Sequence, residues 1–175
     1  MRRDLSSGLT VWFTGLPSAG KTTIARALEK RLLDDGHRVE ILDGDVVRTY
    51  LTKDLGYSRE DRDENIRRIG FVAHMLSRNG VVVLCSVVSP YREVREELRT
   101  LHDGRFIEVY VSTPVDVCSQ RDVKGLYAKQ QSGEMSGLTG VDDPYEPPLE
   151  PEVVVPTHTQ TLDESVEMVW QALHS

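Results

Sequence analysis

The sequence predicts an α/β fold in which helices flank a parallel β-sheet, and two features of the chain indicate it. Short apolar runs alternate with longer amphipathic runs along the 175 residues, which is the pattern of consecutive βαβ units. The composition, 39% hydrophobic and 28% charged, is that of a protein with a buried core rather than a disordered or fibrous one. Because most domains contain about 100 to 200 residues, we expect residues 1–175 to form a single domain.

Four short runs rich in β-branched and aromatic residues predict the strands of this sheet. They cover residues 9–14, 38–42, 81–86 and 106–111. All of them are far shorter than the roughly 20 apolar residues that a membrane helix needs. The N-terminus also lacks the apolar segment of a secretory signal, so we expect a cytoplasmic protein that does not bind membranes.

Capping signals predict where the intervening helices begin. A Ser or Thr followed three residues later by an acidic residue is the pattern of a capping box, and a proline directly after a Ser or Thr fits the first position of a helix. After the third strand, Arg92, Arg95 and Arg99 are spaced to lie along one charged helix face. The paired capping residues are Ser58 with Asp61, Ser89 with Pro90, Thr113 with Pro114, and Thr161 with Glu164.

Residues 129–156 differ from the rest of the chain because the periodicity fades into Gly, Pro, Asp and Glu. An ordinary connection in a compact domain is much shorter, so a run of this length is typical of a lid or a binding loop. We therefore predict a long mobile loop here and place no strand in it.

The charge balance limits the possible partners. Lys and Arg number 21 against 28 Asp and Glu, which gives a formal net charge of -7 at pH 7 and disfavours binding to nucleic acid. An anionic ligand must therefore be held by a local arrangement of donors. Cys85 and Cys118 lack the CxxC spacing and are too few for a disulfide framework, so we expect buried free thiols in a reducing compartment.

A phosphate-binding loop follows the first strand directly. The octet GLPSAGKT at residues 15–22 matches the pattern GxxxxGK(S/T), and it has the strand before it and the helical pattern after it that this loop requires. Backbone N–H groups of such a loop surround phosphate oxygens, Lys21 reaches the outer phosphates, and the Thr22 hydroxyl can bind Mg²⁺. A simple glycine turn is the alternative, but the complete motif favours a nucleoside-triphosphate site. We expect the nucleotide to contact Gly15, Leu16, Pro17, Ser18, Ala19, Gly20, Lys21, Thr22 and Thr23.

Absent motifs narrow the class of nucleotide enzyme, because the same loop serves GTPases, transporters, motors and kinases. The sequence contains neither the NKxD motif of guanine binding nor an LSGGQ motif. Residues 122–125 fit the GTPase pattern DxxG, but they follow a predicted helix rather than a strand. A compact kinase with a small acceptor is the class that remains.

Two carboxylates follow the second strand. Asp43 and Asp45 lie at the carboxyl end of that strand, and open α/β sheets bind ligands at this edge. An acidic group there could accept the proton of an attacking hydroxyl or hold Mg²⁺ through water. Asp-Gly-Asp is also a common turn composition. Its position beside the phosphate-binding loop favours the functional interpretation.

The helical run over residues 59–79 places two polar residues on its buried stripe. With 100° per residue, Arg62 and Asn65 lie on the same face as Ile66, Ile69 and Ala73. A charged group aimed at the core needs a partner, which a bound anion could supply. An ion pair between Arg62 and a neighbouring carboxylate is the alternative.

The third strand ends without the aspartate that many phosphate-loop enzymes use to hold magnesium. We therefore expect Mg²⁺ to depend on Thr22, phosphate, water and Asp45. Arg48 lies a few residues beyond Asp45 in a short helical pattern and could reach into the same crevice.

These motifs together resemble the adenylylsulfate kinase family over nearly the whole chain. The resemblance implies a P-loop fold similar to that of the nucleotide kinases. It also implies transfer of the γ-phosphoryl of Mg-ATP to the ribose 3′-hydroxyl of adenylylsulfate, and a homodimer. The matching stretches, in order, are GLPSAGKTT, LDGDVVR, GYSREDRDENIRRIG, SPYR, RDVKGLYAK and TGVDDPYE.

The resemblance further implies roles for the residues that match the family motifs. Asp45 corresponds to the acidic residue near the 3′-hydroxyl, and Lys124 to a residue whose charge bridges donor and acceptor, so Asp45, Lys124 and Lys21 form the implied catalytic set. A mobile lid is implied at approximately residues 124–150. The implied acceptor-binding residues are Asp43, Asp45, Arg48, Tyr57, Arg62, Asn65, Ser89, Lys124 and Leu138.

Two positions depart from the family pattern, in which aromatic residues sandwich the acceptor adenine. These positions are Tyr57 and Leu138 here, and leucine offers only apolar contact. A kinase for a different small hydroxyl compound is therefore an alternative function. A protein that binds ATP without transferring phosphate is a second alternative, which nothing in the sequence favours.

Overall fold

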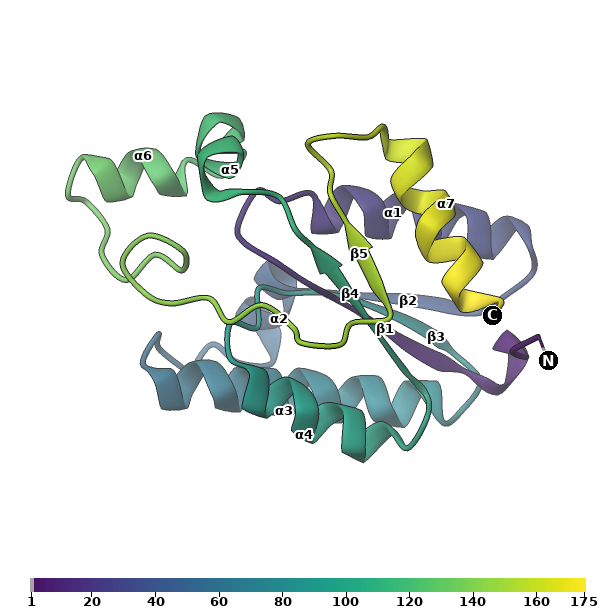
Figure 1. Ribbon diagram of the computed structural model, residues 1–175. Helices are drawn as coiled ribbons and strands as arrows, with labels where there is room; N and C mark the ends of the chain where they lie inside the picture. The colour runs from purple at the N-terminus through teal and green to yellow at the C-terminus, as the bar shows by residue number, and fades with distance from the viewer. Residues whose placement is uncertain (1) are drawn as a thin grey trace.

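The computed structural model describes residues 2–175, and its strands form one parallel sheet in the order β2-β3-β1-β4-β5 (Figure 1). The register pairs Leu9 of β1 with Val82 of β3, and Thr10 of β1 with Phe106 of β4. The four predicted strands are confirmed, each to within one residue at either end. The strands are β1 (Leu9–Thr14), β2 (Val39–Asp43), β3 (Val82–Ser86), β4 (Phe106–Val111) and β5 (Val153–Val155).

Helices cover both faces of the sheet and give the molecule three layers (Figure 1). On one face α1 packs beside α7, and on the other α3 packs beside α4. The short helices α5 and α6 project beyond the sheet, near the end of β4. The helices are α1 (Lys21–Asp34), α2 (Gly44–Tyr50), α3 (Arg59–Ser77), α4 (Arg92–His102), α5 (Val115–Arg121), α6 (Leu126–Gln131) and α7 (Leu162–Leu173), with a 3₁₀ turn at Leu5–Ser7.

The central strand β1 divides the core into two apolar clusters, because successive side chains of a strand point to opposite faces. Val11 and Phe13 belong to the cluster that α1 and α7 cover. Trp12 lies between them in sequence and belongs to the cluster that α3 and α4 cover. Because side chains on both faces of β1 are buried, packing holds the carboxyl end of this strand in place. The glycine loop begins at that end.

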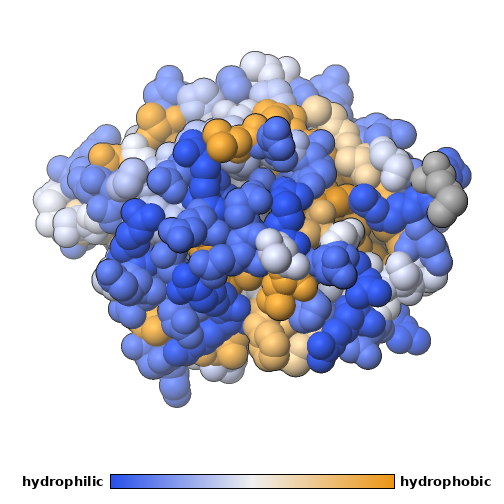
Figure 2. Space-filling view, turned by 60° about the horizontal axis from the view of Figure 1, so that its bottom comes forward, coloured by the Kyte–Doolittle hydropathy of each residue, from blue (hydrophilic) through white to orange (hydrophobic). Residues whose placement is uncertain are grey.

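The outer surface on the side of α3 and α4 is mostly hydrophilic, with small hydrophobic areas between the polar side chains (Figure 2). Arg67 of α3 and Glu97 of α4 form an ion pair across this surface, with nitrogen and oxygen 2.8 Å apart. The buried stripe of α3 is the one that the sequence predicts, since Ile66, Ile69 and Ala73 are all buried.

Two predicted caps are confirmed and two are wrong. Ser58 accepts a hydrogen bond from the Asp61 amide, and Thr161 forms a capping box with Glu164. The caps predicted at Ser89 and Thr113 are absent, because α4 begins after Tyr91 and α5 after Pro114, neither of which makes a side-chain cap.

The Ser89 and Thr113 side chains have tertiary partners instead. The Ser89 hydroxyl accepts a hydrogen bond from Trp12 Nε1 over 3.0 Å, and the Thr113 hydroxyl donates to the Ala19 carbonyl over 2.8 Å. Both hydroxyls therefore connect segments that are distant in sequence instead of capping a helix.

The prediction that residues 129–156 contain no strand is also wrong. Val153–Val155 forms the edge strand β5, which pairs with β4 alone. Its side chains alternate between buried and exposed as expected of an edge strand. A strand of three residues is too short for its two-residue period to stand out in a sequence segment rich in Pro and Glu.

The part of the chain that the structure describes contains no helix long and apolar enough to span a membrane. Cys85 and Cys118 are free and fully buried, as the sequence predicts.

Candidate active site

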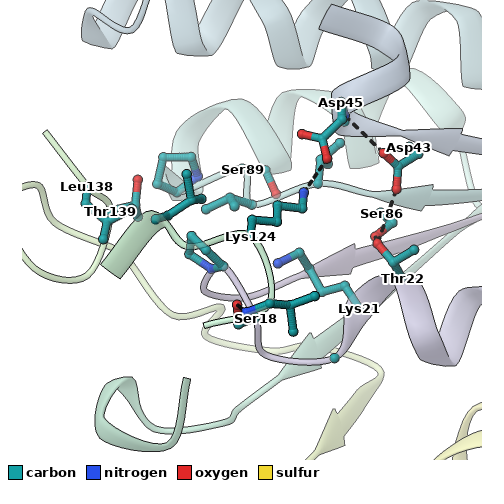
Figure 3. Close-up of a pocket in the computed structure, with 18 of the residues that line it drawn as sticks. Ser18, Lys21, Thr22, Asp43, Asp45, Ser86, Ser89, Lys124, Leu138 and Thr139 are labelled. Carbon is teal, nitrogen blue, oxygen red and sulfur yellow. Dashed lines mark hydrogen bonds and ion pairs between the residues drawn. The ribbon is translucent and has the colours of Figure 1, made fainter. Parts of the chain in front are cut away.

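A cleft lies at the carboxyl ends of the strands, and the glycine loop forms one of its walls (Figure 3). Its volume is about 690 Å³, within the range of about 300 to 1,000 Å³ usual for ligand pockets. The opposite wall comes from the end of β2, from α2 and α3, and from the segment after α5. Of the residues expected at the site, the cleft is lined by Pro17, Ser18, Gly20, Lys21, Thr22, Thr23, Asp43, Asp45, Arg48, Tyr57, Arg62, Asn65, Ser89, Lys124 and Leu138.

The glycine loop connects β1 to α1 in a backbone conformation that specific residues permit. Gly15 and Gly20 both have positive φ, at 153° and 112°. A Cβ at Gly15 would lie 2.6 Å from the Val111 carbonyl oxygen, so a larger residue could not occupy this turn. The loop delivers its N–H groups to the N-terminus of α1, where the helix dipole favours a bound phosphate.

Lys21 lies at the start of α1 and is 8% exposed. Its Nζ donates to the carbonyls of Gly15 at 2.9 Å and Leu16 at 2.7 Å, both in its own loop. Burial, and secondarily the charge of Lys124, lowers the pKa of Lys21 to about 7. A bound polyphosphate would give this buried ammonium group a negatively charged partner.

Three oxygen-bearing side chains meet beside the glycine loop (Figure 3). The Thr22 hydroxyl donates to Asp43 Oδ2 over 3.2 Å and lies 2.9 Å from the Ser86 hydroxyl. The sequence singles out Asp45 for magnesium, but Asp43 is the carboxylate in contact with Thr22. Ser86 ends β3 at the position where an aspartate is common, and the sequence gives no signal for its role.

The chemistry of this group fits Mg²⁺, which prefers hard oxygen ligands and keeps several waters. Thr22 offers a hydroxyl and Asp43 a carboxylate on one side of the cleft. No cluster of three or more His, Cys, Asp or Glu occurs among residues 2–175, so a protein-only cage is not present there. The side chains suit an ion that also binds phosphate and water.

Asp45 and Lys124 form an ion pair across the cleft (Figure 3). Asp45 lies in the first turn of α2, where Asp43 Oδ1 accepts a hydrogen bond from its amide over 3.0 Å. Lys124 lies between α5 and α6, far away in sequence. The two expected catalytic residues are thus in direct contact.

Arg48 contacts the protein itself rather than open solvent. Its Nη1 donates to the carbonyls of Leu55 and Gly56, and its Cζ lies 4.4 Å from the centroid of the Tyr57 ring. Tyr57 is 69% exposed at the rim of the cleft. Arg48 therefore positions the loop that carries Tyr57.

Arg62 and Asn65 both line the cleft from α3. Arg62 donates to the Thr139 hydroxyl and the Gly137 carbonyl, and its Nη2 lies 3.0 Å from Asp143 Oδ2. The ion pair that the sequence left as the alternative for Arg62 is therefore present. Asn65 is 8% exposed, and its buried Oδ1 has no hydrogen-bond partner within residues 2–175.

The segment after α5 rests on the glycine loop at three successive residues. A Cβ on Gly140 would lie 2.6 Å from the Leu16 side chain. The Tyr127 hydroxyl donates to the Pro17 carbonyl over 2.9 Å, and the Val123 amide donates to the Ser18 hydroxyl over 3.1 Å. The residues between the fixed GxxxxGK positions thus form the surface against which this segment packs.

The comparison with protein families decides among the classes that share this loop. A family model described as adenylylsulphate kinase matches residues 7–156. The chain belongs to the adenylylsulfate kinase family. The family expected from the sequence motifs is thereby confirmed, and with it an ATP-dependent phosphotransferase.

Curated relatives and solved structures of the adenylylsulfate kinase family match nearly the whole chain. A probable adenylyl-sulfate kinase of Synechocystis sp. is 62% identical over 166 residues, covering 95% of this chain and 93% of the relative. The Mycobacterium tuberculosis APS kinase in complex with AMPPNP and APS has a TM-score of 0.90 at 42% identity, over 95% of this chain and 98% of that one. A hexameric APS kinase from Thiobacillus denitrificans has a TM-score of 0.72 at 35% identity, over 96% of this chain and 29% of that one. These likenesses confirm the predicted P-loop fold.

In this member of the adenylylsulfate kinase family, the cleft includes three residues that the sequence analysis does not assign to the site. Arg121, Thr157 and Gln160 line the cleft on the side of α1 and α7. Arg121 Nη1 donates to the Ala19 carbonyl over 3.2 Å and to the Thr157 hydroxyl over 3.0 Å. Arg121 begins the RDVKGLYAK stretch, although that match implies no site role for it, and Thr157 and Gln160 lie in the loop before α7, where neither periodicity nor motif spacing marks them.

Proposed function

We propose that this protein transfers the γ-phosphoryl group of ATP to the ribose 3′-hydroxyl of adenylylsulfate, giving ADP and 3′-phosphoadenylyl sulfate. The observation that carries this proposal is that the glycine loop and Asp45 open onto the same cleft. In the transfer, the 3′-oxygen bonds to the γ-phosphorus as the bond to the β–γ bridging oxygen breaks. The family of the chain and the APS complex of its structural neighbour support the choice of acceptor.

The donor side needs mainly positioning and charge neutralisation, because charge spreads over the equatorial oxygens in phosphoryl transfer. The loop amides and Lys21 would hold the polyphosphate, while Thr22 and Asp43 would hold Mg²⁺ with water and phosphate. The ion would neutralise phosphate charge when bound. The Lys21 ammonium group already lies within its loop, where it would exchange hydrogen bonds to the Gly15 and Leu16 carbonyls for bonds to phosphate oxygens.

On the acceptor side, Asp45 would orient the 3′-hydroxyl and accept its proton. Lys124 pairs with Asp45 across the cleft, which keeps a positive charge beside the path of the phosphoryl group. The unpartnered amide oxygen of Asn65 offers an acceptor for a ligand donor such as an amine or a ribose hydroxyl. Arg48 and Arg62 would contribute positive charge toward the phosphosulfate, and Ser89 would line its pocket.

We also propose that residues 124–150 act as the lid of one domain spanning residues 1–175. The lid would exclude water, so that ATP is not hydrolysed instead. Its contacts with Leu16, Pro17 and Ser18 support this role, because the lid closes on the loop that binds the donor. The homodimer implied by the family resemblance and the cytoplasmic location expected from the sequence stay predictions.

A coupled assay with purified protein, Mg-ATP and adenylylsulfate tests the proposal. We expect ADP release that depends on adenylylsulfate, with 3′-phosphoadenylyl sulfate identified by chromatography. Adenosine 5′-phosphate serves as the matched acceptor without sulfate. ADP release at equal rates with and without any acceptor contradicts the proposal.

The second candidate function is phosphorylation of a different small hydroxyl compound. It is favoured by Leu138, which lines the cleft at a position where the family pattern has an aromatic residue. Parallel assays with other nucleotides and sugars as acceptors distinguish the two. A higher kcat/KM for another hydroxyl compound than for adenylylsulfate establishes the second function.

A further inference from the structure

Arg95 is a buried arginine that lies behind the cleft rather than in it. It is 1% exposed and points from α4 toward the sheet, although its sequence context shows only a charged helix face. An arginine taken out of water needs all its donors satisfied, so its partners identify what it holds. The spacing of Arg92, Arg95 and Arg99 predicts one charged helix face but gives no sign that Arg95 is buried.

The guanidinium of Arg95 bonds to three separate parts of the chain. Its Nη1 donates to the Ser89 carbonyl over 2.6 Å, and its Nη2 donates to the Glu146 carbonyl over 2.5 Å. Its Nε donates to Glu108 Oε2 over 3.1 Å, on β4. The fork geometry of arginine allows these three directions at once, which a lysine cannot reproduce.

The first two partners belong to segments that enclose the acceptor side of the cleft. Ser89 belongs to the 87–90 segment, whose residues all line the cleft, and Figure 3 shows Ser89 between Asp45 and the pair Leu138 and Thr139. Glu146 ends the stretch that carries Leu138, Thr139 and the Arg62 partner Asp143. Arg95 therefore joins the 87–90 segment to residues 137–146, which we call the closing segment.

The 87–90 segment and the closing segment are also joined directly. The Glu146 amide donates to the Pro90 carbonyl over 2.8 Å, and Glu146 Oε1 accepts from the Arg92 amide over 2.9 Å. The Tyr145 hydroxyl lies 2.8 Å from the hydroxyl of Thr14, the last residue of β1. Arg95 lies at the centre of this joint.

The backbone at Ser89 explains why such a joint is needed. Ser89 has φ of 44°, a left-handed conformation that costs a non-glycine residue free energy and persists only where its surroundings hold it. Arg95 binds the Ser89 carbonyl, while Trp12 binds the Ser89 hydroxyl. Loss of the Arg95 bond would leave the Ser89 carbonyl with only the longer hydrogen bond from the Thr14 hydroxyl, at 3.5 Å.

We propose that Arg95 is a positioning residue that fixes the acceptor half of the cleft by tying Glu146, at the end of the closing segment, to Ser89. The proposal rests on the proposed function, since the acceptor used to test it is adenylylsulfate. The residues expected to bind ATP have other partners than Arg95. Lys21 donates to the glycine loop, and Thr22 contacts Asp43 and Ser86. Loss of Arg95 should therefore weaken acceptor binding much more than donor binding.

The neighbouring Arg99 supplies a matched control. It lies on the same helix one turn later and forms an ion pair with Glu152, beyond the closing segment and just before β5. It also reaches Glu108 Oε1 at 3.4 Å. Arg99→Lys thus perturbs the same helix and the same buried carboxylate without touching Ser89 or Glu146.

Steady-state kinetics of Arg95→Lys, Arg99→Lys and the unaltered protein test the proposal. For Arg95→Lys we expect the KM for adenylylsulfate to rise at least tenfold while the KM for ATP changes less than twofold. Arg99→Lys should change both constants less than twofold. Equal changes in the two KM values of Arg95→Lys, or none in either, overturn the proposal.

A double variant keeps the test valid if lysine is poorly accommodated beside Glu108. Arg95→Met with Glu108→Gln removes both buried charges together, which avoids leaving one unpaired. It should fold and show the same selective rise in the KM for adenylylsulfate. A folded double variant with normal KM values contradicts the proposal.

Amide hydrogen exchange gives a readout that does not depend on catalysis. In Arg95→Lys we expect faster exchange at residues 137–146 and at Ser89, with α1 unchanged. If the unaltered protein does not phosphorylate adenylylsulfate, the proposed function fails, while exchange still decides whether Arg95 holds this segment. Exchange that rises uniformly over the chain shows a general loss of stability and overturns the positioning role.

Discussion

Arg62 Nη2 lies 3.0 Å from Asp143 Oδ2, so the closing segment rests on α3 through an ion pair at the acceptor side of the cleft. Arg62 also donates to the Gly137 carbonyl and the Thr139 hydroxyl. One guanidinium therefore holds three residues of a seven-residue stretch, and the only carboxylate among them is Asp143. The sequence places Arg62 at the site but gives no indication of this partner.

We predict that Asp143→Asn raises the KM for adenylylsulfate about fivefold, because a hydrogen bond to a charged partner contributes about 1 kcal/mol more than a neutral one. The KM for ATP should change less than twofold. Steady-state kinetics measure both constants, with the exposed Glu150→Gln as control. An unchanged KM for adenylylsulfate in Asp143→Asn shows that the ion pair does not shape the acceptor site.

Lys21→Ala and Asp45→Ala should each lower kcat by at least about 100-fold, as expected for loss of a phosphate ligand or a general base. Neither change should unfold the protein. The Asp45 side chain is 69% exposed, and Lys21 is a buried cation without a carboxylate partner. Single-turnover assays and thermal unfolding measure the two effects. Normal turnover in Asp45→Ala excludes this carboxylate from the chemistry.

Asp43→Asn should raise the Mg²⁺ concentration needed for half-maximal activity about tenfold, since the change removes the charge beside Thr22. Asparagine can still cap α2, because it also accepts a hydrogen bond from the Asp45 amide. Titration of activity with Mg²⁺ makes the measurement. Glu40→Gln removes an exposed charge from the same strand and should leave the titration unchanged. Identical titrations of the two variants contradict the assignment of Asp43.

Leu138→Phe should tighten adenylylsulfate binding by up to about tenfold, because stacking of an aromatic ring on a base adds about 0.5 to 1.5 kcal/mol. Leu138 lines the cleft, packs with the core and is 5% exposed. Calorimetric titration of both proteins measures the affinity, and Leu149→Phe on the exposed surface is the control. Equal affinities in all three proteins show that residue 138 does not lie over the base.

His102 should make the protein less stable as the pH falls from about 6.5 to about 4. Burial lowers the pKa of His102 to about 4 from its ordinary value of 6.5. Between these values the unfolded chain binds a proton that the folded protein does not, so acid favours unfolding. The contribution is fully present above pH 6.5, and its loss reaches at most about 3 kcal/mol near pH 4.

Urea unfolding at several pH values measures this effect against His102→Asn. The His102 Nδ1 contacts the Leu98 carbonyl over 2.7 Å, and an asparagine amide can donate there as well. The free energy of unfolding of the variant should fall less steeply over this range. Parallel slopes for the two proteins exclude His102 as the source.

The local sequence determined much of the fold and one half of the site. The strands follow from short β-branched runs, and the buried stripe of α3 follows from a period of 3.6 residues. The glycine loop follows from a motif whose residues are neighbours in the chain. In each case the interactions join residues close in sequence, so spacing alone carries the information.

Only the tertiary structure decided the burial of Arg95, the pairing of Arg62 with Asp143, the contact between Thr22 and Asp43, and the strand β5. Arg95 continues the spacing of the half-buried Arg92 and Arg99, and differs because Glu108 and two carbonyls from distant segments surround it. The physical reason is common to all four features. Each depends on groups that the folded chain brings together from separate elements, and a charge is stable in the interior only where such partners meet it.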